Sequence, residues 1–290
     1  GNIDVNAPYS TVFVFDRVNG FYAVENVLNG IVYGVFTCFY GKPLVAHILK
    51  CDNLIANLIL CEFFSWYFLV FEMIRNYKKL NNDPDHNFLI CKEICQKIVE
   101  SAKIQLEIVQ KEALPKLENF LLVSNHRCFF DVVFLLAAIE DTISFVAAKE
   151  LWHYPILSRY LDSIGCVALE RGAKKMETIK NNIVSMHQAL AKGNLVLFPE
   201  GECSYYDEQM HKFRKGGFIG LDAKQPIVPV YMKPERLSSI GRWIVPKGRV
   251  AVFIGSFFTP SEVEKGPPTA TKIADMARDE ILALRQMSEG

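Results

Sequence analysis

Short apolar runs alternate with stretches of helical periodicity from about residue 86 to the end of the chain, and this alternation constrains the fold more than any other feature. The runs that predict strands lie at 104–109, 119–124, 142–148, 166–170, 195–198, 227–232 and 250–254. The runs that predict helices lie at 86–101, 132–139, 150–163, 174–192, 216–223 and 270–286. Strands that alternate with helices build a parallel sheet with helices packed on its faces. We therefore expect an α/β domain whose largely parallel sheet is flanked by helices.

The first 80 residues have a different character. Two long apolar stretches, 21–40 and 54–74, are separated by the helix-breaking segment Gly41-Lys42-Pro43. The second stretch is just long enough to span a bilayer, but Asn57 and Glu62 interrupt it. We therefore expect an N-terminal apolar helical hairpin that docks on or in a membrane, half-embedded rather than spanning. The alternative is a pair of buried helices in a soluble core.

The polar segment 81–85, with Pro84 inside it, is the clearest linker in the chain. We place a domain boundary there, with a membrane-associating helical region at 1–82 and the α/β domain at 83–290. A basic run at 75–79 would suit an anionic membrane surface. Scattered cysteines fit a reducing location, so we expect the protein at the cytoplasmic face of a membrane.

Composition excludes two classes of function. The formal net charge is zero, which argues against a nucleic-acid binder that depends on phosphate contacts. The 8 cysteines include no C-x-x-C pair and no cysteine–histidine cluster. The sequence therefore predicts neither a metal site nor a disulfide scaffold.

The segment Asn125-His126-Arg127-Cys128-Phe129-Phe130-Asp131 lies between a predicted strand and a predicted helix. A carboxylate that accepts the Nδ1 proton of an imidazole leaves Nε2 free to take a proton from a hydroxyl. His126 and Asp131 can meet only if His126 lies in the turn and Asp131 reaches back from the first turn of the helix. Such a pair is the base and its orienting group from a catalytic triad, with no serine beside it. A purely structural histidine–aspartate pair is the alternative.

Three further motifs lie at strand ends, and together with the first they are specific in order and spacing. The four segments resemble the glycerolipid acyltransferase family, the PlsC-like 1-acyl-sn-glycerol-3-phosphate acyltransferase group. Asn125 to Asp131 matches the N-H-x(4)-D block of that family, and Gly165 to Arg171 is similar to its G-x-x-x-[IL]-[DE]-R block. Phe198 to Gly201 matches F-P-E-G, and 227–230 is similar to the short apolar fourth block.

The resemblance implies transfer of a fatty acyl group from acyl-CoA or acyl carrier protein to the free hydroxyl of 1-acyl-sn-glycerol-3-phosphate. The product would be phosphatidic acid, and no cofactor or metal is implied. His126 would be the general base, Asp131 would orient it, and backbone N–H groups at the start of the following helix would stabilise the oxyanion. The candidate substrate-binding residues are Arg171, Glu200, Gly201, Lys212, Arg214 and Lys215. The implied partners are the lysophospholipid, the acyl donor and a phospholipid membrane.

The third motif departs from the family pattern, because Gly201-Glu202-Cys203-Ser204 stands where the family usually has Gly-Thr-Arg-Ser. The arginine associated with the phosphate of the acceptor is missing. An acyltransferase for another lysolipid or for glycerol-3-phosphate is therefore an alternative, as is a non-catalytic lipid-binding protein of the same fold. We expect Cys128 to be a packing residue rather than a nucleophile, and His211 to be a surface or packing residue. Nothing in the sequence assigns a role to Cys203.

Overall fold

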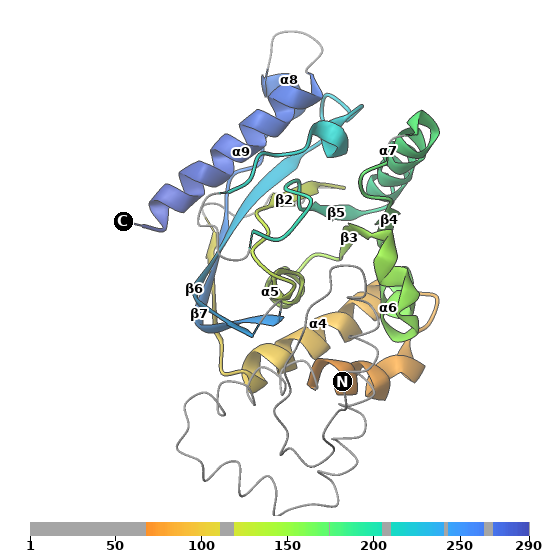
Figure 1. The fold of residues 1–290 in the computed structure, drawn as a ribbon, viewed down its shortest axis with the longest axis vertical. Helices are drawn as coiled ribbons and strands as arrows, with labels where there is room; N and C mark the ends of the chain where they lie inside the picture. Colours follow the sequence, from red (N-terminus) through yellow and green to blue (C-terminus); the bar gives the residue numbers. More distant parts are fainter. Residues whose placement is uncertain are drawn as a thin grey trace, which may run out of the picture. The chain divides into compact units, whose positions relative to one another are not determined.

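The computed structural model describes residues 68–110, 119–173, 175–204, 210–240, 243–263 and 269–289 (Figure 1). The chain divides into two compact units, Gly1–Asn57 and Leu58–Gly290, and every described residue belongs to the second. The predicted apolar hairpin therefore lies outside the described residues except for its last part, at 68–74. Within the described ranges, no helix combines the length and the apolar character that crossing a bilayer requires.

Seven strands form one sheet in the order β1-β7-β6-β2-β5-β3-β4. Their bounds are β1 Gln105–Gln110, β2 Leu121–Ser124, β3 Ile143–Ala148, β4 Val167–Leu169, β5 Asn194–Leu197, β6 Ile227–Ile240 and β7 Trp243–Ile254. Neighbouring strands run parallel except for β6 and β7, which form an antiparallel hairpin. The prediction of a largely parallel sheet is confirmed.

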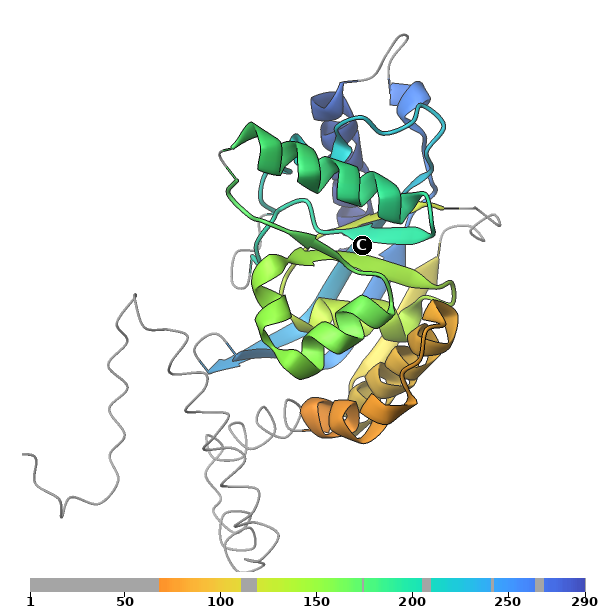
Figure 2. The same ribbon diagram turned by 90° about the vertical axis from the view of Figure 1, so that its right-hand side faces the viewer.

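Helices cover both faces of this sheet, with α7 on one face and α4 and α6 on the other (Figure 2). The helices are α4 Pro84–Ser101, α5 Phe130–Ala138, α6 Pro155–Ser163, α7 Met176–Leu190, α8 Pro260–Val263 and α9 Ala270–Met287, with short 3₁₀ segments η1 Tyr77–Lys79, η2 Lys149–His153 and η3 Lys215–Phe218. The strand β2 is buried along its whole length. Leu121 and Val123 pack toward α7 and α9, and Leu122 packs toward α4 and α5. Burial on both faces explains why the strand is a continuous apolar run.

Residues 68–76 are helical and pack into the same core as α4. Leu69 and Met73 are buried there, and the hydroxyl of Tyr160 donates a hydrogen bond to the carbonyl oxygen of Met73 at 2.7 Å. The boundary predicted at 82–83 therefore falls inside the second compact unit, because the side chains before the linker pack against the helix after it.

Four elements differ from the sequence prediction. The helix expected at 216–223 is only the short 3₁₀ segment η3, because Gly220 has φ +70° and ends it. The helix expected at 150–163 is divided into η2 and α6 because Pro155, which has no N–H to donate, occupies the first position of α6. The strands expected at 227–232 and 250–254 are longer, because β6 and β7 continue as a hairpin whose register shifts between Pro234 and Arg236.

Candidate active site

His126 lies in the turn between β2 and α5, and Asp131 lies in the first turn of α5. The His126 Nδ1 atom is 2.8 Å from Asp131 Oδ2. The sequence predicted that these side chains could meet only in this arrangement, and the structure confirms the geometry. The Asp131 side chain is 2% exposed and the His126 side chain 17%, so the carboxylate is shielded while part of the imidazole stays accessible.

The same Asp131 oxygen also accepts backbone N–H bonds from Arg127 at 2.5 Å and from Cys128 at 2.8 Å. These bonds hold the carboxylate in place, so it can orient the imidazole. The N–H groups of Asp131 and Val132 donate to carbonyl oxygens of the turn. The N–H groups of Asp131 and Val132, at the start of α5, therefore already have acceptors, and the oxyanion role of this helix start stays a prediction.

The backbone of His126 is bound to the third sequence motif. Its N–H donates to Glu200 Oε1 at 2.8 Å, and its carbonyl oxygen accepts from the N–H of Ser204 at 2.8 Å and from Ser204 Oγ at 3.1 Å. Glu200 is 2% exposed, and its Oε2 accepts from the N–H of His211 at 2.9 Å. The buried carboxylate therefore holds the turn that carries His126. His211 also has a carboxylate neighbour, since its Nδ1 lies 3.9 Å from Glu200 Oε2.

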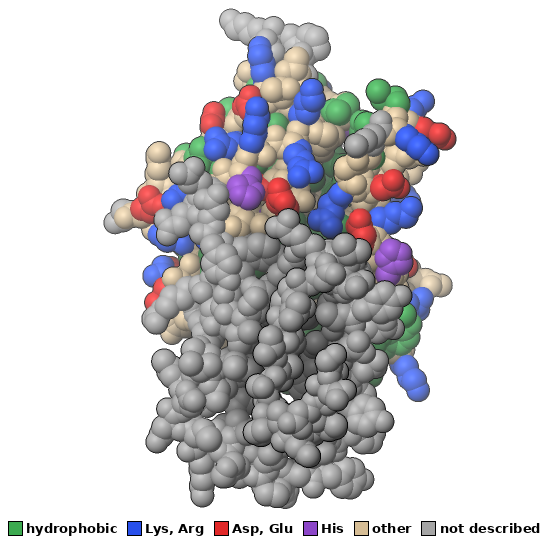
Figure 3. All heavy atoms as spheres, in the orientation of Figure 1, with side chains coloured by type: hydrophobic (Ala, Val, Ile, Leu, Met, Phe, Trp, Pro, Cys, Tyr) green, Lys and Arg blue, Asp and Glu red, His purple; other side chains and the backbone are tan. Residues whose placement is uncertain are grey.

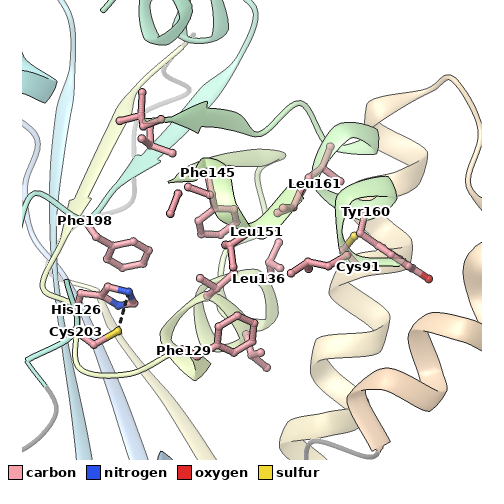
Figure 4. Close-up of a pocket in the computed structure, with 18 of the residues that line it drawn as sticks. Cys91, His126, Phe129, Leu136, Phe145, Leu151, Tyr160, Leu161, Phe198 and Cys203 are labelled. Carbon is pink, nitrogen blue, oxygen red and sulfur yellow. Dashed lines mark hydrogen bonds between the residues drawn. The ribbon is translucent and has the colours of Figure 1, made fainter. Parts of the chain in front are cut away.

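The second ring nitrogen of His126 faces a thiol that the sequence did not point to. Cys203 Sγ lies 3.2 Å from Nε2, and the imidazole stacks on the ring of Phe198 with centroids 4.2 Å apart (Figure 4). Burial of the imidazole lowers its pKa, but the hydrogen bonds with Asp131 and Cys203 outweigh burial. The pKa of His126 is therefore raised above its ordinary value of 6.5.

An apolar cavity of about 570 Å³ begins at this pair and extends toward α4 and α6 (Figure 4). His126, Phe198 and Cys203 lie at one end. The side chains between and beyond them include Phe129, Leu136, Phe145, Leu151, Leu161, Tyr160 and Cys91. A volume of this size is ordinary for a small-molecule site, and aliphatic and aromatic walls suit a hydrocarbon chain.

Arg171, Gly201 and Glu202 also line the cavity. Arg171 Nη2 is 4.0 Å from Glu150 Oε2, and both side chains are about half exposed. Acidic and basic side chains are interspersed over the described part of the face that Figure 3 shows. An exposed ion pair such as that of Arg171 with Glu150 contributes little to stability, so Arg171 can exchange its carboxylate partner for an anionic ligand.

The remaining predicted substrate-binding residues lie outside the lining of this cavity. Lys212, Arg214 and Lys215 are exposed. Arg214 Nη2 is 3.7 Å from Glu202 Oε1, and the Arg214 side chain covers Gly201. Gly201 has φ +75°, and a Cβ atom there would lie 2.8 Å from Arg214 Nε. Position 201 therefore requires glycine because the Arg214 side chain lies against it.

Gly217 has a packing role. A Cβ atom there would lie 2.5 Å from Leu197 Cδ2, so the glycine lets η3 pack against β5. Cys128 is fully buried and its Sγ is 3.7 Å from Asp131 Oδ1, which agrees with the predicted packing role. The Asn125 amide exchanges hydrogen bonds with the backbone of Met232 at 3.0 and 2.7 Å, and so fixes the turn to β6.

Comparison with known proteins identifies several similar proteins. The family model described as Acyltransferase matches residues 105–233. The lysophospholipid acyltransferase LPEAT1 of Arabidopsis thaliana is 28% identical over 39% of this chain and 28% of its own length. The 1-acyl-sn-glycerol-3-phosphate acyltransferase of Saccharomyces cerevisiae is 28% identical over 44% of this chain and 42% of its own length. This chain therefore matches less than half of each of these two proteins.

A bacterial relative and a solved structure extend the comparison. The 1-acyl-sn-glycerol-3-phosphate acyltransferase of Bacillus subtilis is 26% identical over 55% of this chain and 76% of its own length. The crystal structure of the 1-acyl-sn-glycerophosphate acyltransferase PlsC from Thermotoga maritima superimposes with a TM-score of 0.63 at 20% identity. It covers 80% of this chain and 96% of the PlsC chain, which shows a shared fold. The family model over 105–233, the named relatives and the shared fold support a PlsC-like acyltransferase family for this chain.

Proposed function

We propose that this protein transfers a fatty acyl group from an acyl thioester to the free hydroxyl of 1-acyl-sn-glycerol-3-phosphate, giving phosphatidic acid. The observation that carries the proposal is the His126 imidazole, oriented by Asp131 at 2.8 Å, at one end of an apolar cavity of about 570 Å³. A base beside a hydrocarbon-lined cavity suits a reaction that joins an acyl chain to an alcohol. The names of the yeast and Bacillus relatives support this acceptor.

The chemistry of His126 follows from its two ring nitrogens. Nδ1 is held by Asp131, and Nε2 takes the proton of the lysophospholipid hydroxyl as its oxygen attacks the thioester carbonyl. The Asp131 carboxylate stabilises the imidazolium that forms. General-base assistance of this kind contributes about 10²–10⁴ in rate. The carbon–sulfur bond of the thioester then breaks, and the thiol takes up the proton.

The cavity and its opening bind different parts of the substrates. The acyl chain lies against the apolar walls, while Arg171 holds the phosphate of the acceptor. Acyl-CoA and acyl carrier protein are both suitable donors, since the reacting group of each is a thioester. The acceptor and the product are lipids, so the enzyme acts at the surface of a phospholipid membrane, on its cytoplasmic side.

A second acceptor class is favoured by one observation. Glu202 lines the cavity together with Arg171, so an acidic and a basic side chain share its mouth. A zwitterionic headgroup, with a phosphate and an amine, can use both charges. The name of the Arabidopsis relative specifies only a lysophospholipid, which includes acceptors of this class.

Product analysis tests the proposal. The purified full chain is incubated with labelled acyl-CoA or acyl carrier protein and with lysophosphatidate, lysophosphatidylethanolamine or glycerol-3-phosphate. We expect labelled phosphatidic acid from the wild type and none from His126→Ala. The matched control is His86→Ala, which changes an exposed histidine at the start of α4 and should keep wild-type activity. Wild-type activity in His126→Ala, or no product from the wild type with any acceptor, would refute the proposal.

A further inference from the structure

We infer that Cys203 is a further catalytic residue, a nucleophile that carries the acyl group as a thioester between the donor and the lipid hydroxyl. The inference rests on the proposed acyl transfer and replaces the direct attack on the donor with two successive acyl transfers. Cys203 Sγ lies 3.2 Å from His126 Nε2, and His126 Nδ1 lies 2.8 Å from Asp131 Oδ2. A nucleophile within hydrogen-bond reach of a base, which is oriented by a third group, is the arrangement of a catalytic triad.

The backbone on both sides of Cys203 fixes this contact. Ser204 donates two hydrogen bonds to the carbonyl oxygen of His126, and the Glu200 carboxylate accepts one from the backbone N–H of His126. The loop that carries the thiol is thus bound to the very residue whose ring the thiol faces. The Phe198 ring stacks on the imidazole of His126 and so restrains the orientation of the imidazole. These contacts place the backbone of Cys203 beside His126, where its sulfur lies 3.2 Å from Nε2.

The other described cysteines lack one or the other requirement. Cys91 and Cys95 line the far part of the cavity and have no described hydrogen bond to a histidine. Cys128 is fully buried against Asp131, and burial raises the pKa of its thiol well above the ordinary value. Burial also raises the pKa of Cys166, to about 12. Among the residues that the structure describes, Cys203 combines a place on the cavity wall with a base at its sulfur.

The position of the thiol also bears on the order of events. Cys203 occupies the Nε2 site that the lipid hydroxyl needs. In direct transfer the hydroxyl has to displace the thiol from the base. In a two-step route the thiol reacts first, and its conversion to a thioester removes its proton and frees Nε2 for the hydroxyl. The covalent route thus uses the Cys203 thiol as the nucleophile, whereas the direct route requires the hydroxyl to displace that thiol from Nε2.

Each step balances. In the first, His126 Nε2 takes the thiol proton, Cys203 Sγ bonds to the donor carbonyl carbon, and the carbon–sulfur bond of the donor breaks. His126 returns the proton to the sulfur of the donor, which leaves as a free thiol. In the second, Nε2 takes the proton of the lysophospholipid hydroxyl, the oxygen bonds to the acyl carbon, and the bond to Cys203 breaks. Cys203 then recovers its proton, and nothing is oxidised or reduced.

Trapping the acyl-enzyme is the first test. The full chain is incubated with acyl-CoA without acceptor, and its intact mass is measured, followed by peptide mapping. We expect one added acyl group on Cys203 that neutral hydroxylamine removes, in the wild type and in the control Cys166→Ala. Cys203→Ala should gain none, and His126→Ala should gain it about 10²-fold more slowly or worse. Circular dichroism and thermal unfolding confirm that each variant is folded, and Cys203→Ser provides a second, nearly isosteric variant.

Kinetic competence is the second test, because acyl-CoA can also modify thiols without catalysis. Lysophosphatidate is added to the isolated acyl-enzyme by rapid mixing. We expect the thioester to disappear at a rate no lower than kcat, with the acyl group recovered in the lipid. Double-reciprocal plots should be parallel, and Cys203→Ala should lose at least 10²-fold in kcat.

The outcomes separate this inference from the proposed function. Wild-type kcat in folded Cys203→Ala, or an adduct consumed more slowly than kcat, overturns the covalent route and leaves direct acyl transfer standing. An acyl-enzyme that forms on Cys203 but passes its acyl group to no lysolipid overturns the proposed function. It would show a thiol that is acylated for another purpose.

Discussion

The Glu200 carboxylate accepts a hydrogen bond at 2.8 Å from the backbone N–H of His126, across 74 residues of sequence. Its other oxygen accepts from the N–H of His211 at 2.9 Å. Burial raises the pKa of Glu200, while the two N–H donors act in the opposite direction. One buried side chain thus connects the turn that carries the imidazole with the loop that carries Cys203.

Replacing Glu200 tests this connection. Glu200→Ala leaves two backbone N–H groups without their acceptor, and each unpaired buried group costs about 1–3 kcal/mol. We expect a lower free energy of unfolding in urea and a lower kcat. Glu200→Gln restores one acceptor and should recover part of both. The control is Glu202→Ala, whose carboxylate is 64% exposed and whose unfolding free energy should change by less than about 0.5 kcal/mol. Equal stability of Glu200→Ala and Glu202→Ala would show that the connection does not matter.

The raised pKa of His126 predicts the pH dependence of acyl transfer. The hydroxyl step needs the neutral imidazole, so kcat/KM for the lysophospholipid should fall on the acid side with an apparent pKa above 6.5. Asp131→Asn removes a hydrogen bond and a charge that raise the pKa, and leaves burial, which lowers it. We expect the acid limb to move to lower pH while the maximum rate falls about 10²–10⁴-fold. An acid limb at the same pH in both proteins would mean that it reports another group.

The far part of the cavity should set the length of the acyl chain. Cys91 lies near Tyr160, away from the imidazole (Figure 4), and Cys91→Phe fills space there. We expect kcat/KM to fall at least 10-fold for long acyl donors and to change little for short ones. Overpacking by the larger side chain should lower the free energy of unfolding by about 1–3 kcal/mol. Leu89→Phe is the control, because Leu89 is 61% exposed on the same helix α4. A uniform fall for all chain lengths would place the acyl chain elsewhere.

Arg171 should act on the headgroup of the acceptor and not on the acyl donor. A charge-assisted hydrogen bond contributes about 1.5–3 kcal/mol, so Arg171→Ala should raise KM for lysophosphatidate about 10–150-fold. KM for the acyl donor and the rate with monoacylglycerol, which has no phosphate, should stay the same. Arg159→Ala removes an exposed arginine of α6 and serves as the control. A rise in donor KM instead would assign Arg171 to the donor.

The sequence predicted most of the sheet because strand identity is local here. The runs at 121–124 and 194–197 are apolar on both faces, and such runs are typical of parallel strands covered by helices. The hairpin of β6 and β7 was underestimated because Pro234 and Pro246 interrupt its pattern, whereas pairing between neighbouring strands maintains it. The boundary predicted at 82–83 lies inside the second compact unit, because a polar linker does not reveal what packs across it.

The candidate site was predictable only where its groups are close in the chain. His126 and Asp131 lie within one strand–turn–helix unit, so their contact follows from local geometry. Arg171 was expected at a strand end, and it does line the cavity. Lys212 and Lys215 lie outside the lining of the cavity. Charge in a sequence does not indicate which side of a loop faces a cavity.

The sequence by itself determined an α/β fold with a parallel sheet and an imidazole–carboxylate pair at its edge, since periodicity and short spacing encode both. Only the tertiary structure decided what Nε2 faces. Cys203 reaches His126 because β2 and β5 are neighbours in the sheet and Glu200 and Ser204 bind the turn between β2 and α5. Contacts between segments 77 residues apart depend on strand order and loop path, which no local pattern records.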